Sequence, residues 1–365
     1  MIENKSNNNL SSKTKQKTKK IVLTGGGTAG HVYPALAVAE NLKNFDLHYI
    51  GGEGIEKNIL SNFKSITYHQ IPTVKLQRKL TLKNLLIPFK LHKAIKEAKK
   101  ILKDLSPNLI FSKGGFVAVP VVLAAKKLNI PIISHESDLS FGLANKIILK
   151  YATVMCTTFA PTSEKNSKCI HTGQPIRQKV FEGKNLSYFQ NEKPTLLVLG
   201  GSLGAKFLND IVFNNLDELT KTYNILHICG KQNYQDIKHN GYKIFPFVDN
   251  IQDFFASANC VLTRGGSGVI NELLALSKPM LIVPLSKKCS RGDQIENAKL
   301  FEQLGYAEML EEENYSFEKL QKKLQYLLKN SQKIKENMKK TAKNNAVQQI
   351  SEIILSKITW KFFQC

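Results

Sequence analysis

Short apolar runs alternate with longer helical patterns along this chain. In the first half, four runs predict β-strands, at residues 21–24, 47–50, 108–111 and 130–134. Leu36, Ala39 and Leu42 recur at helical spacing and predict a helix over 35–43, and a second helix is predicted over 90–102. Strands that alternate with helices are typical of a parallel sheet covered by helices on both faces.

The same alternation starts again halfway along the chain. Five further strands are predicted, at residues 195–199, 224–228, 243–247, 259–263 and 280–283. The polar run over 172–194 separates the two halves and is the best candidate for a domain boundary. We therefore predict a doubly wound α/β protein with two Rossmann-like domains, residues 20–175 and 176–345, that face each other across a cleft. A final helix within 346–365 is predicted to pack back on the first domain.

The composition fits this division. With 365 residues, 42% of them hydrophobic, the chain is long enough for two domains with separate cores. Residues 1–19 are polar and rich in lysine and asparagine, which predicts a disordered basic tail and no signal peptide. The longest apolar stretch, 116–125, is broken by Pro120 and has about half of the roughly 20 residues that a membrane-spanning helix needs. The six cysteines show no metal-type spacing, so reduced thiols of a cytosolic protein are expected.

The formal net charge of +23 favours an anionic partner. Residues 75–103 concentrate this charge, with ten Lys or Arg residues against Glu97 alone, and large aliphatic side chains lie between them. Two interpretations stay open: the segment lies on an anionic membrane surface, or it is a solvated helix whose leucines face the core. Nucleic acid is a weaker candidate because Phe89 is the only aromatic residue there that can stack on bases. The candidate membrane or acceptor contacts are Leu76, Lys79, Leu82, Lys83, Leu86, Phe89 and Lys90.

The sequence TGGGTAGH at residues 24–31 closes the first predicted strand and opens a helical stretch. Backbone N–H groups and a helix N-terminus at such a turn attract anions, and His31 adds a titratable group. The turn also matches the GxGxxG dinucleotide fingerprint, which needs an acidic residue about 20 positions on. Glu53 is the only candidate and follows a glycine pair, so NAD is disfavoured. A similar turn, GGSLGA, begins at Gly200.

A third glycine turn, in LTRGGSGVINELLA at residues 262–275, has the features of a nucleotide-diphosphate site. Its glycines let the backbone approach a diphosphate, and the N-terminus of the following helix stabilises the negative charge. Glu272, in that helix, can accept hydrogen bonds from both hydroxyls of a ribose. Arg264 either supplies positive charge to the diphosphate or pairs with a neighbouring carboxylate.

Two more motifs follow predicted strands. Gln294 and Asn297, in SRGDQIENA, lie three residues apart on one face of a helix start, where their amides can read sugar hydroxyls. His135 and Glu136, in SHESDLSFGLANK, end a strand at the edge where doubly wound sheets bind ligands. A surface His–Glu pair is the alternative interpretation of the second motif.

Together these motifs resemble the MurG family of peptidoglycan UDP-N-acetylglucosamine (UDP-GlcNAc) transferases. GGGTAGH, FSKGGFVAVP, HESD, TGQPIR, GGSLGA, RGGS followed by NE, and SRGDQIENA occur in the family's order across nearly all of residues 20–345. The resemblance implies a GT-B fold, with the acceptor and the membrane on the first domain and the donor on the second. It implies inverting transfer of N-acetylglucosamine (GlcNAc) from UDP-GlcNAc to the C4 hydroxyl of N-acetylmuramic acid (MurNAc) in undecaprenyl-diphosphate-MurNAc-pentapeptide (lipid I), which forms lipid II.

The resemblance also assigns roles to single residues. His31 is similar to the histidine proposed as the base, and Glu136 is the second candidate for the group that takes a proton from the acceptor hydroxyl. The implied donor-binding residues are Thr28, Ala29, Gly30, Asp138, Arg177, Ser202, Val248, Arg264, Gly266, Ser267, Gly268, Val269, Ile270, Asn271, Glu272 and Gln294. The sequence has no DxD motif, so no metal or other cofactor is expected, and helix N-termini with Arg264 or Arg177 are expected to stabilise the diphosphate.

Two positions depart from the common family pattern. Ala29 replaces a glycine, so the turn is strained if that position needs a positive φ. Asp138, in HESD, replaces an amide proposed to contact the donor. The family's lipid acceptor implies a peripheral protein on the cytoplasmic face of the cell membrane, with residues 75–103 at the lipid surface. A diacylglycerol glycosyltransferase and a UDP-GlcNAc 2-epimerase are alternatives that share the donor site, whereas a nucleic-acid-binding role leaves the glycine turns unexplained.

Overall fold

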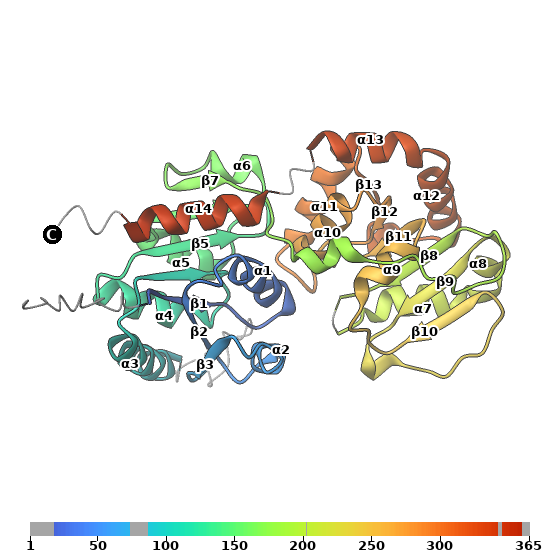
Figure 1. Cartoon of the computed structure of the whole chain (residues 1–365). Helices are drawn as coiled ribbons and strands as arrows, with labels where there is room; N and C mark the ends of the chain where they lie inside the picture. Colours follow the sequence, from blue (N-terminus) through green and yellow to red (C-terminus); the bar gives the residue numbers. More distant parts are fainter. Residues whose placement is uncertain (1–17, 74–86, 202, 342–344, 360–365) are drawn as a thin grey trace, which may run out of the picture.

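The computed structural model describes residues 18–73, 87–201, 203–341 and 345–359, and these form two α/β halves (Figure 1). Some predictions therefore lie outside the described residues: those at Leu76, Lys79, Leu82, Lys83, Leu86 and Ser202, and the tail over 1–17.

The first half holds a parallel seven-stranded sheet of order β3-β2-β1-β4-β5-β6-β7. Its strands are β1 (Lys20–Thr24), β2 (Asp46–Gly51), β3 (Ile66–Gln70), β4 (Leu109–Ser112), β5 (Ile132–Glu136), β6 (Val154–Thr157) and β7 (Cys169–His171). One face is covered by α1 (Ala29–Glu40), α2 (Ile55–Leu60) and α14 (Ala346–Thr359). The other face is covered by α3 (Ile87–Leu105), α4 (Ala118–Lys127) and α5 (Leu143–Tyr151), and α6 (Ala160–Ser163) precedes β7.

The second half holds a parallel six-stranded sheet of order β10-β9-β8-β11-β12-β13. Its strands are β8 (Thr195–Leu199), β9 (Asn224–Ile228), β10 (Tyr242–Phe245), β11 (Cys260–Thr263), β12 (Met280–Ile282) and β13 (Ala307–Met309). Its helices are α7 (Lys206–Asn214), α8 (Leu216–Thr222), α9 (Ile251–Ser257), α10 (Ser267–Ala275), α11 (Asp293–Gln303), α12 (Phe317–Lys329) and α13 (Ser331–Thr341), with 3-10 turns η2 (Gln178–Glu182), η3 (Lys231–Asn233) and η4 (Glu312–Asn314).

Both sheets use the same strand order over six positions, which confirms the predicted pair of doubly wound sheets. The order reverses between β1 and β4 in the first sheet and between β8 and β11 in the second. Ligands of such sheets bind outside the carboxyl ends of the strands at these reversal points. The turns after β1, β4, β8 and β11 are therefore the places to look for a site.

Strain at Ala29 is expected only if that position needs a positive φ, and the structure shows that it does not. Helix α1 begins at Ala29, several residues before the predicted start, and Pro34 lies inside it. The positive φ of this turn, 86°, belongs to Gly27, whereas Ala29 already has a helical conformation. Alanine is a favourable helix residue, so the substitution fits the first turn of α1.

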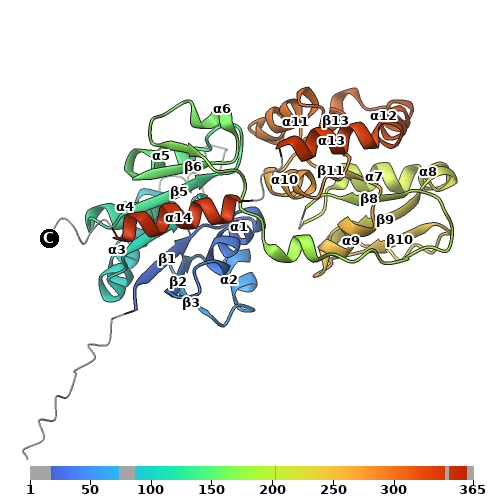
Figure 2. The same cartoon turned by 45° about the horizontal axis from the view of Figure 1, so that its top comes forward.

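The C-terminal helix α14 packs against the first sheet, although the chain reaches it from the second half (Figures 1 and 2). Ile350, Ile354 and Ile358 form a stripe at helical spacing and are almost completely buried beside α1. Burial of such side chains stabilises a fold by about 1.5–3 kcal/mol each. The chain thus crosses between the halves twice, over 172–194 and after α13.

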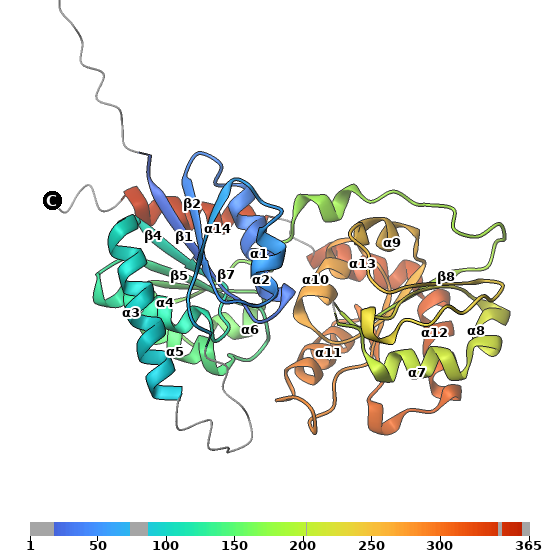
Figure 3. The same ribbon diagram turned by 90° about the horizontal axis from the view of Figure 1, so that it is seen from below.

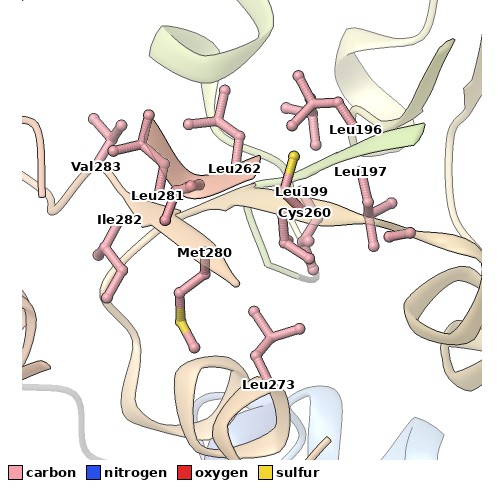
Figure 4. Close-up of a cluster of buried hydrophobic side chains, with 14 of the residues drawn as sticks. Leu196, Leu197, Leu199, Cys260, Leu262, Leu273, Met280, Leu281, Ile282 and Val283 are labelled. Atoms are coloured by element: carbon pink, nitrogen blue, oxygen red, sulfur yellow. The ribbon is translucent and has the colours of Figure 1, made fainter. Parts of the chain in front are cut away.

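The core of the second half fixes the strands that carry its turns. Leu197, Leu262 and Leu281, from three adjacent strands, are fully buried, and Leu273 of α10 packs into the same cluster (Figure 4). Close packing of this kind leaves the strand ends little freedom. Across the described ranges, no helix has the length and apolar character that a membrane span requires. Cys156, Cys169, Cys229 and Cys260 are free thiols.

Candidate active site

The turns after β1 and β11 meet at the boundary between the two halves. Helix α1 begins after the first turn and α10 after the second, and the two helices lie on either side of this boundary (Figures 1 and 3). A Cβ atom built on Gly268 would lie 4.0 Å from the Cα of Gly30, so the first turns of the helices are close together. Two helix N-termini that converge in this way create a positive potential that suits an anion.

His31 lies in the first turn of α1, and its hydrogen bonds define its tautomer. Nδ1 is 2.9 Å from the carbonyl oxygen of Gly26 and 3.1 Å from Oγ1 of Thr28. A carbonyl oxygen only accepts, so Nδ1 carries the proton and Nε2 keeps its lone pair. No described residue is hydrogen-bonded to Nε2. Burial, and then the charge of Lys113, lower the pKa of His31, so the imidazole is neutral at neutral pH, as a general base requires.

Glu136, the other candidate base, is buried and holds its own loop together. Its Oε1 accepts from the backbone N–H of Asp138 at 3.0 Å. Its Oε2 accepts from the backbone N–H of Gly142 at 3.1 Å and from the side-chain amide of Asn145 at 2.9 Å. Both oxygens are therefore occupied by donors that organise the HESD loop. This geometry favours His31 over Glu136 as the base.

Lys113 is a buried cation of this region that the sequence did not reveal as a site residue. Its Nζ lies 2.6 Å from Nδ1 of His135 and 2.7 Å from Oγ of Ser137. Nε2 of His135 is 2.9 Å from the carbonyl oxygen of Gly173, so His135 donates there and accepts from the lysine at Nδ1. Burial lowers the pKa of Lys113 to about 7. The available signal was a lysine directly after an apolar strand, in FSKGG.

Asp138 contacts the second half of the molecule. Its Oδ2 is 2.7 Å from Nη2 of Arg291, and its Oδ1 accepts from the side-chain amide of Asn297 at 3.1 Å. The side-chain oxygen of Asn297 accepts from the backbone N–H of Leu139 at 3.0 Å. The prediction that Asn297 reads sugar hydroxyls is wrong, because its side chain is fully buried in these contacts. We call Asp138, Arg291 and Asn297 the interdomain clasp.

A cavity of about 600 Å³ opens at the carboxyl end of the second sheet. Four predicted donor-binding residues line it: Arg264, Gly266, Val269 and Gln294. The glycine turn after β8 lines it too, with Gly200, Gly201 and Gly204. Its volume is in the range of small-molecule and cofactor pockets. The side-chain oxygen of Gln294 is already bonded to the backbone N–H of Leu285 at 3.0 Å, so this residue shapes the wall.

Arg264 is held by protein groups. Its Nη1 lies 2.6 Å from Oε1 of Glu312 and donates to the carbonyl oxygen of Val283 at 3.1 Å. Both side chains of the ion pair are largely buried. Of the two alternatives for Arg264, pairing with a neighbouring carboxylate is therefore the one that the structure contains. Its charge is neutralised within the wall of the cavity.

Glu272 and Arg177 lie near the junction of the two halves. Burial raises the pKa of Glu272 to about 7, and the charge of Arg177 opposes this rise. The guanidinium carbon of Arg177 is 3.9 Å from the ring centroid of Tyr33, a cation–π contact with α1. Nε of Arg177 is buried and has no hydrogen-bond partner in the described ranges. Arg177 thus keeps an unused hydrogen-bond donor within electrostatic range of Glu272.

The other predicted donor residues differ in burial and in hydrogen bonding. Ser267 donates to the carbonyl oxygen of Ser137 across the boundary, and Asn271 donates back to Ser267 at 2.8 Å. Ile270 is fully buried in the core, and Val248 packs partly buried against the same core. A donor contact by these residues stays a prediction, as it does for Thr28, Ala29 and Gly30.

The described part of the basic segment is helix α3. Ala94, Ala98 and Leu102 form its buried face against the sheet. Phe89 is 75% exposed, and Lys90 beside it is exposed too. Helix α3 therefore has both a stripe that faces the core and an exposed apolar residue among lysines, the features on which the two interpretations of the basic segment depend.

Comparison with known proteins gives a consistent picture. Residues 21–157 match the glycosyltransferase family 28 N-terminal domain, and residues 195–353 match the C-terminal domain of that family. The chain is 47% identical to a UDP-N-acetylglucosamine--N-acetylmuramyl-(pentapeptide) pyrophosphoryl-undecaprenol N-acetylglucosamine transferase of Clostridium tetani, over 94% of this chain and 99% of the relative. The same identity holds for the enzyme of that name from Clostridium botulinum strain Kyoto, over 92% and 98%.

Solved structures agree with this result. The crystal structure of Acinetobacter baumannii MurG is similar with a TM-score of 0.72 and 27% identity, over 93% of this chain and 99% of that one. A kitacinnamycin glycosyltransferase has a TM-score of 0.71 at 12% identity, over 94% of this chain and all of that one. The second likeness shows the fold alone, which is that of two-domain glycosyltransferases.

Proposed function

Since this chain belongs to the MurG family of UDP-N-acetylglucosamine--N-acetylmuramyl-(pentapeptide) pyrophosphoryl-undecaprenol N-acetylglucosamine transferases, we propose that it converts lipid I to lipid II. It transfers GlcNAc from UDP-GlcNAc to the C4 hydroxyl of MurNAc. One observation carries the proposal. The turn that lines the donor cavity, with Gly266 and Val269, approaches α1 at Gly30, next to the neutral imidazole of His31.

The reaction follows from this arrangement. Nε2 of His31 accepts the proton of the C4 hydroxyl as the hydroxyl oxygen bonds to the anomeric carbon of GlcNAc. The bond from that carbon to the UDP oxygen breaks on the opposite side, so the configuration inverts and UDP leaves with the electron pair. The N-terminus of α10 and the donor groups of Arg177 then stabilise the diphosphate. Glu272 accepts hydrogen bonds from the ribose hydroxyls.

In the central experiment, purified protein is incubated with labelled UDP-GlcNAc and a lipid I analogue. We expect transfer by the wild type and its loss in His31→Ala, with UDP affinity retained. Absence of transfer by the wild type would refute the function. A His31→Ala variant that keeps a tenth of the wild-type rate would refute only the assignment of the base, and Glu136→Ala then tests the second candidate. Parallel reactions with diacylglycerol, or with UDP-GlcNAc alone, reveal a diacylglycerol glycosyltransferase or a 2-epimerase.

Metal independence is part of the proposal, because protein groups carry the charge of the leaving diphosphate. We expect EDTA to leave the transfer rate unchanged. A rate that falls with EDTA and returns with Mg²⁺ would contradict this assignment of charge.

We further propose that the protein associates peripherally with the cytoplasmic face of the membrane through α3. Phe89 is exposed among lysines, the composition of a segment that inserts at an anionic lipid surface. We expect Lys90→Glu, Lys93→Glu and Lys96→Glu, combined, to abolish binding to phosphatidylglycerol vesicles. A matched control, with the same charge change at exposed Lys329, Lys333 and Lys339 of the second half, keeps its binding. Equal binding by both triple variants would refute the role of α3.

A further inference from the structure

Glu56 is a fully buried carboxylate between two glycine turns. It is the second residue of α2, and its side chain has no exposed surface. Oε2 accepts from the backbone N–H of Gly27 at 3.2 Å, and Oε1 accepts from the backbone N–H of Gly52 at 3.0 Å. A Cβ atom on Gly26 or on Gly54 would come within 2.8 Å of a carboxylate oxygen. The glycines of both turns therefore leave the space that this carboxylate fills.

The two hydrogen bonds of the first turn share one peptide group. The peptide that joins Gly26 to Gly27 donates its N–H to Glu56 and accepts at its carbonyl oxygen from Nδ1 of His31, at 2.9 Å. Carboxylate, peptide and imidazole are thus connected in series. In the part of the chain that the structure describes, no basic side chain forms an ion pair with Glu56, so the backbone amides are its partners.

We propose that Glu56 is a positioning residue for His31 that acts through the Gly26–Gly27 peptide. A peptide that donates to a carboxylate is polarised, so its carbonyl oxygen becomes a stronger acceptor. This strengthens the bond from Nδ1, holds the proton on that nitrogen and leaves Nε2 as the basic atom. Carboxylates that contact a histidine directly have the same effect in hydrolase triads. Here a peptide lies between the two side chains. The proposal rests on the proposed role of His31 as the base.

Other charged groups also face His31 and must be separated from this effect. Lys113 follows β4, Asp138 follows β5, and Arg291 reaches across from the second half. The hydrogen bond to Gly26 raises the pKa of His31, against the larger effect of burial, which lowers it. Loss of the carboxylate weakens that hydrogen bond and lowers the pKa of His31 further. None of the three other groups contacts Glu56. A variant at Glu56 therefore isolates the connection from Glu56 through the Gly26–Gly27 peptide to His31, which we call the relay.

The test compares Glu56→Gln with Glu53→Gln, an exposed glutamate three residues earlier. The side-chain ¹⁵N signals of His31 report which nitrogen holds the proton, and their titration gives its pKa. We expect Glu56→Gln to mix the two tautomers, to lower this pKa and to reduce kcat about 10- to 100-fold, part of the 10²–10⁴ that a general base supplies. The KM for UDP-GlcNAc stays the same, and Glu53→Gln matches the wild type in every measurement.

A merely structural role predicts a different result. If Glu56→Gln leaves the tautomer and the pKa of His31 unchanged, the relay is refuted even where kcat falls. Should the amide prevent folding, Glu56→Asp keeps the charge at a greater distance and is expected to show a partial shift of the His31 signals. An unchanged spectrum in that variant refutes the relay too. A wild type that shows the fixed tautomer and no transfer would instead refute the proposed function and leave the relay standing.

Discussion

Glu272→Gln tests the donor site through two effects of opposite sign: the variant is expected to gain stability without ligand and to bind UDP more weakly. In the unliganded protein, burial raises the pKa of Glu272 from an ordinary 4.5 to about 7. A carboxyl whose folded pKa is raised contributes most stability below its unfolded pKa, and this stability is lost as the pH rises through the folded pKa. Each pH unit between the two values corresponds to about 1.4 kcal/mol. Ionisation of Glu272 therefore costs the unliganded fold on the order of 3 kcal/mol above pH 7.

Glutamine removes this cost, so the variant gains stability relative to the wild type between pH 5 and pH 8. Donor binding changes the other way. A hydrogen bond to a charged group contributes about 1.5–3 kcal/mol, so loss of one such bond to the ribose weakens UDP binding by roughly 10- to 100-fold. In the wild type, UDP affinity falls as the pH drops below about 7, because protonation removes the acceptor. In Glu272→Gln this pH dependence disappears.

The assay combines urea unfolding at pH 5 and pH 8 with calorimetric titration of UDP at the same pH values. Glu296→Gln, at an exposed glutamate of α11, is the matched control and is expected to behave as the wild type in both measurements. The reasoning is refuted if Glu272→Gln binds UDP within about twofold of the wild type. It is also refuted if the variant shows the same loss of stability between pH 5 and pH 8 as the wild type.

Four further predictions follow from the described contacts. His31→Ala lowers kcat about 10²- to 10⁴-fold without a change in the Kd for UDP, and a variant that keeps a tenth of the rate would contradict its role. Lys113→Met removes a buried charge that lowers the pKa of His31, so the acid limb of the kcat/KM profile moves to higher pH; an unmoved limb argues against the coupling. Asp138→Ala breaks the interdomain clasp, and X-ray scattering of the unliganded protein is expected to show a larger radius of gyration than the wild type. Ile354→Ala costs about 2–5 kcal/mol in urea unfolding, and a loss under 1 kcal/mol would show that α14 adds little to the fold.

Much of the fold follows from local patterns in the sequence. The predicted bounds of β8 and β9 agree with the structure because TLLVL and NILHI are short apolar runs that end shortly before a glycine, Gly200 or Gly230. Strands β3, β6, β7 and β13 escaped prediction. ITYHQ, CIH and AEM are short and partly polar and gain their strand conformation from neighbouring strands. VMCT of β6 is apolar and buried but has only four residues. The start of α1 was misplaced because Pro34 resembles a helix start, yet it lies inside the helix.

Only those parts of the site that lie within a single turn and its helix could be predicted from the sequence. Glycine turns and their helices can be recognised from spacing, and so can His31 and Glu272. Partners that are distant in sequence cannot: Asp138 and Arg291 are 153 positions apart and meet only after both sheets have formed. The same holds for Arg264, because its partner Glu312 follows two strands later in the chain. The isolated sequence gives no sign of which glutamate fills the first turn.

The buried Glu56 makes the two halves of a repeated fold unequal. Both sheets have the same strand order and both have a glycine turn at the reversal point, the arrangement that receives a nucleotide phosphate. In the first half the protein places its own carboxylate against that turn, whereas in the second half the turn opens into the cavity. In the first half, the carboxylate of Glu56 thus takes the place of a nucleotide phosphate. The chain should therefore bind UDP with a stoichiometry of one, although it contains two nucleotide-type folds.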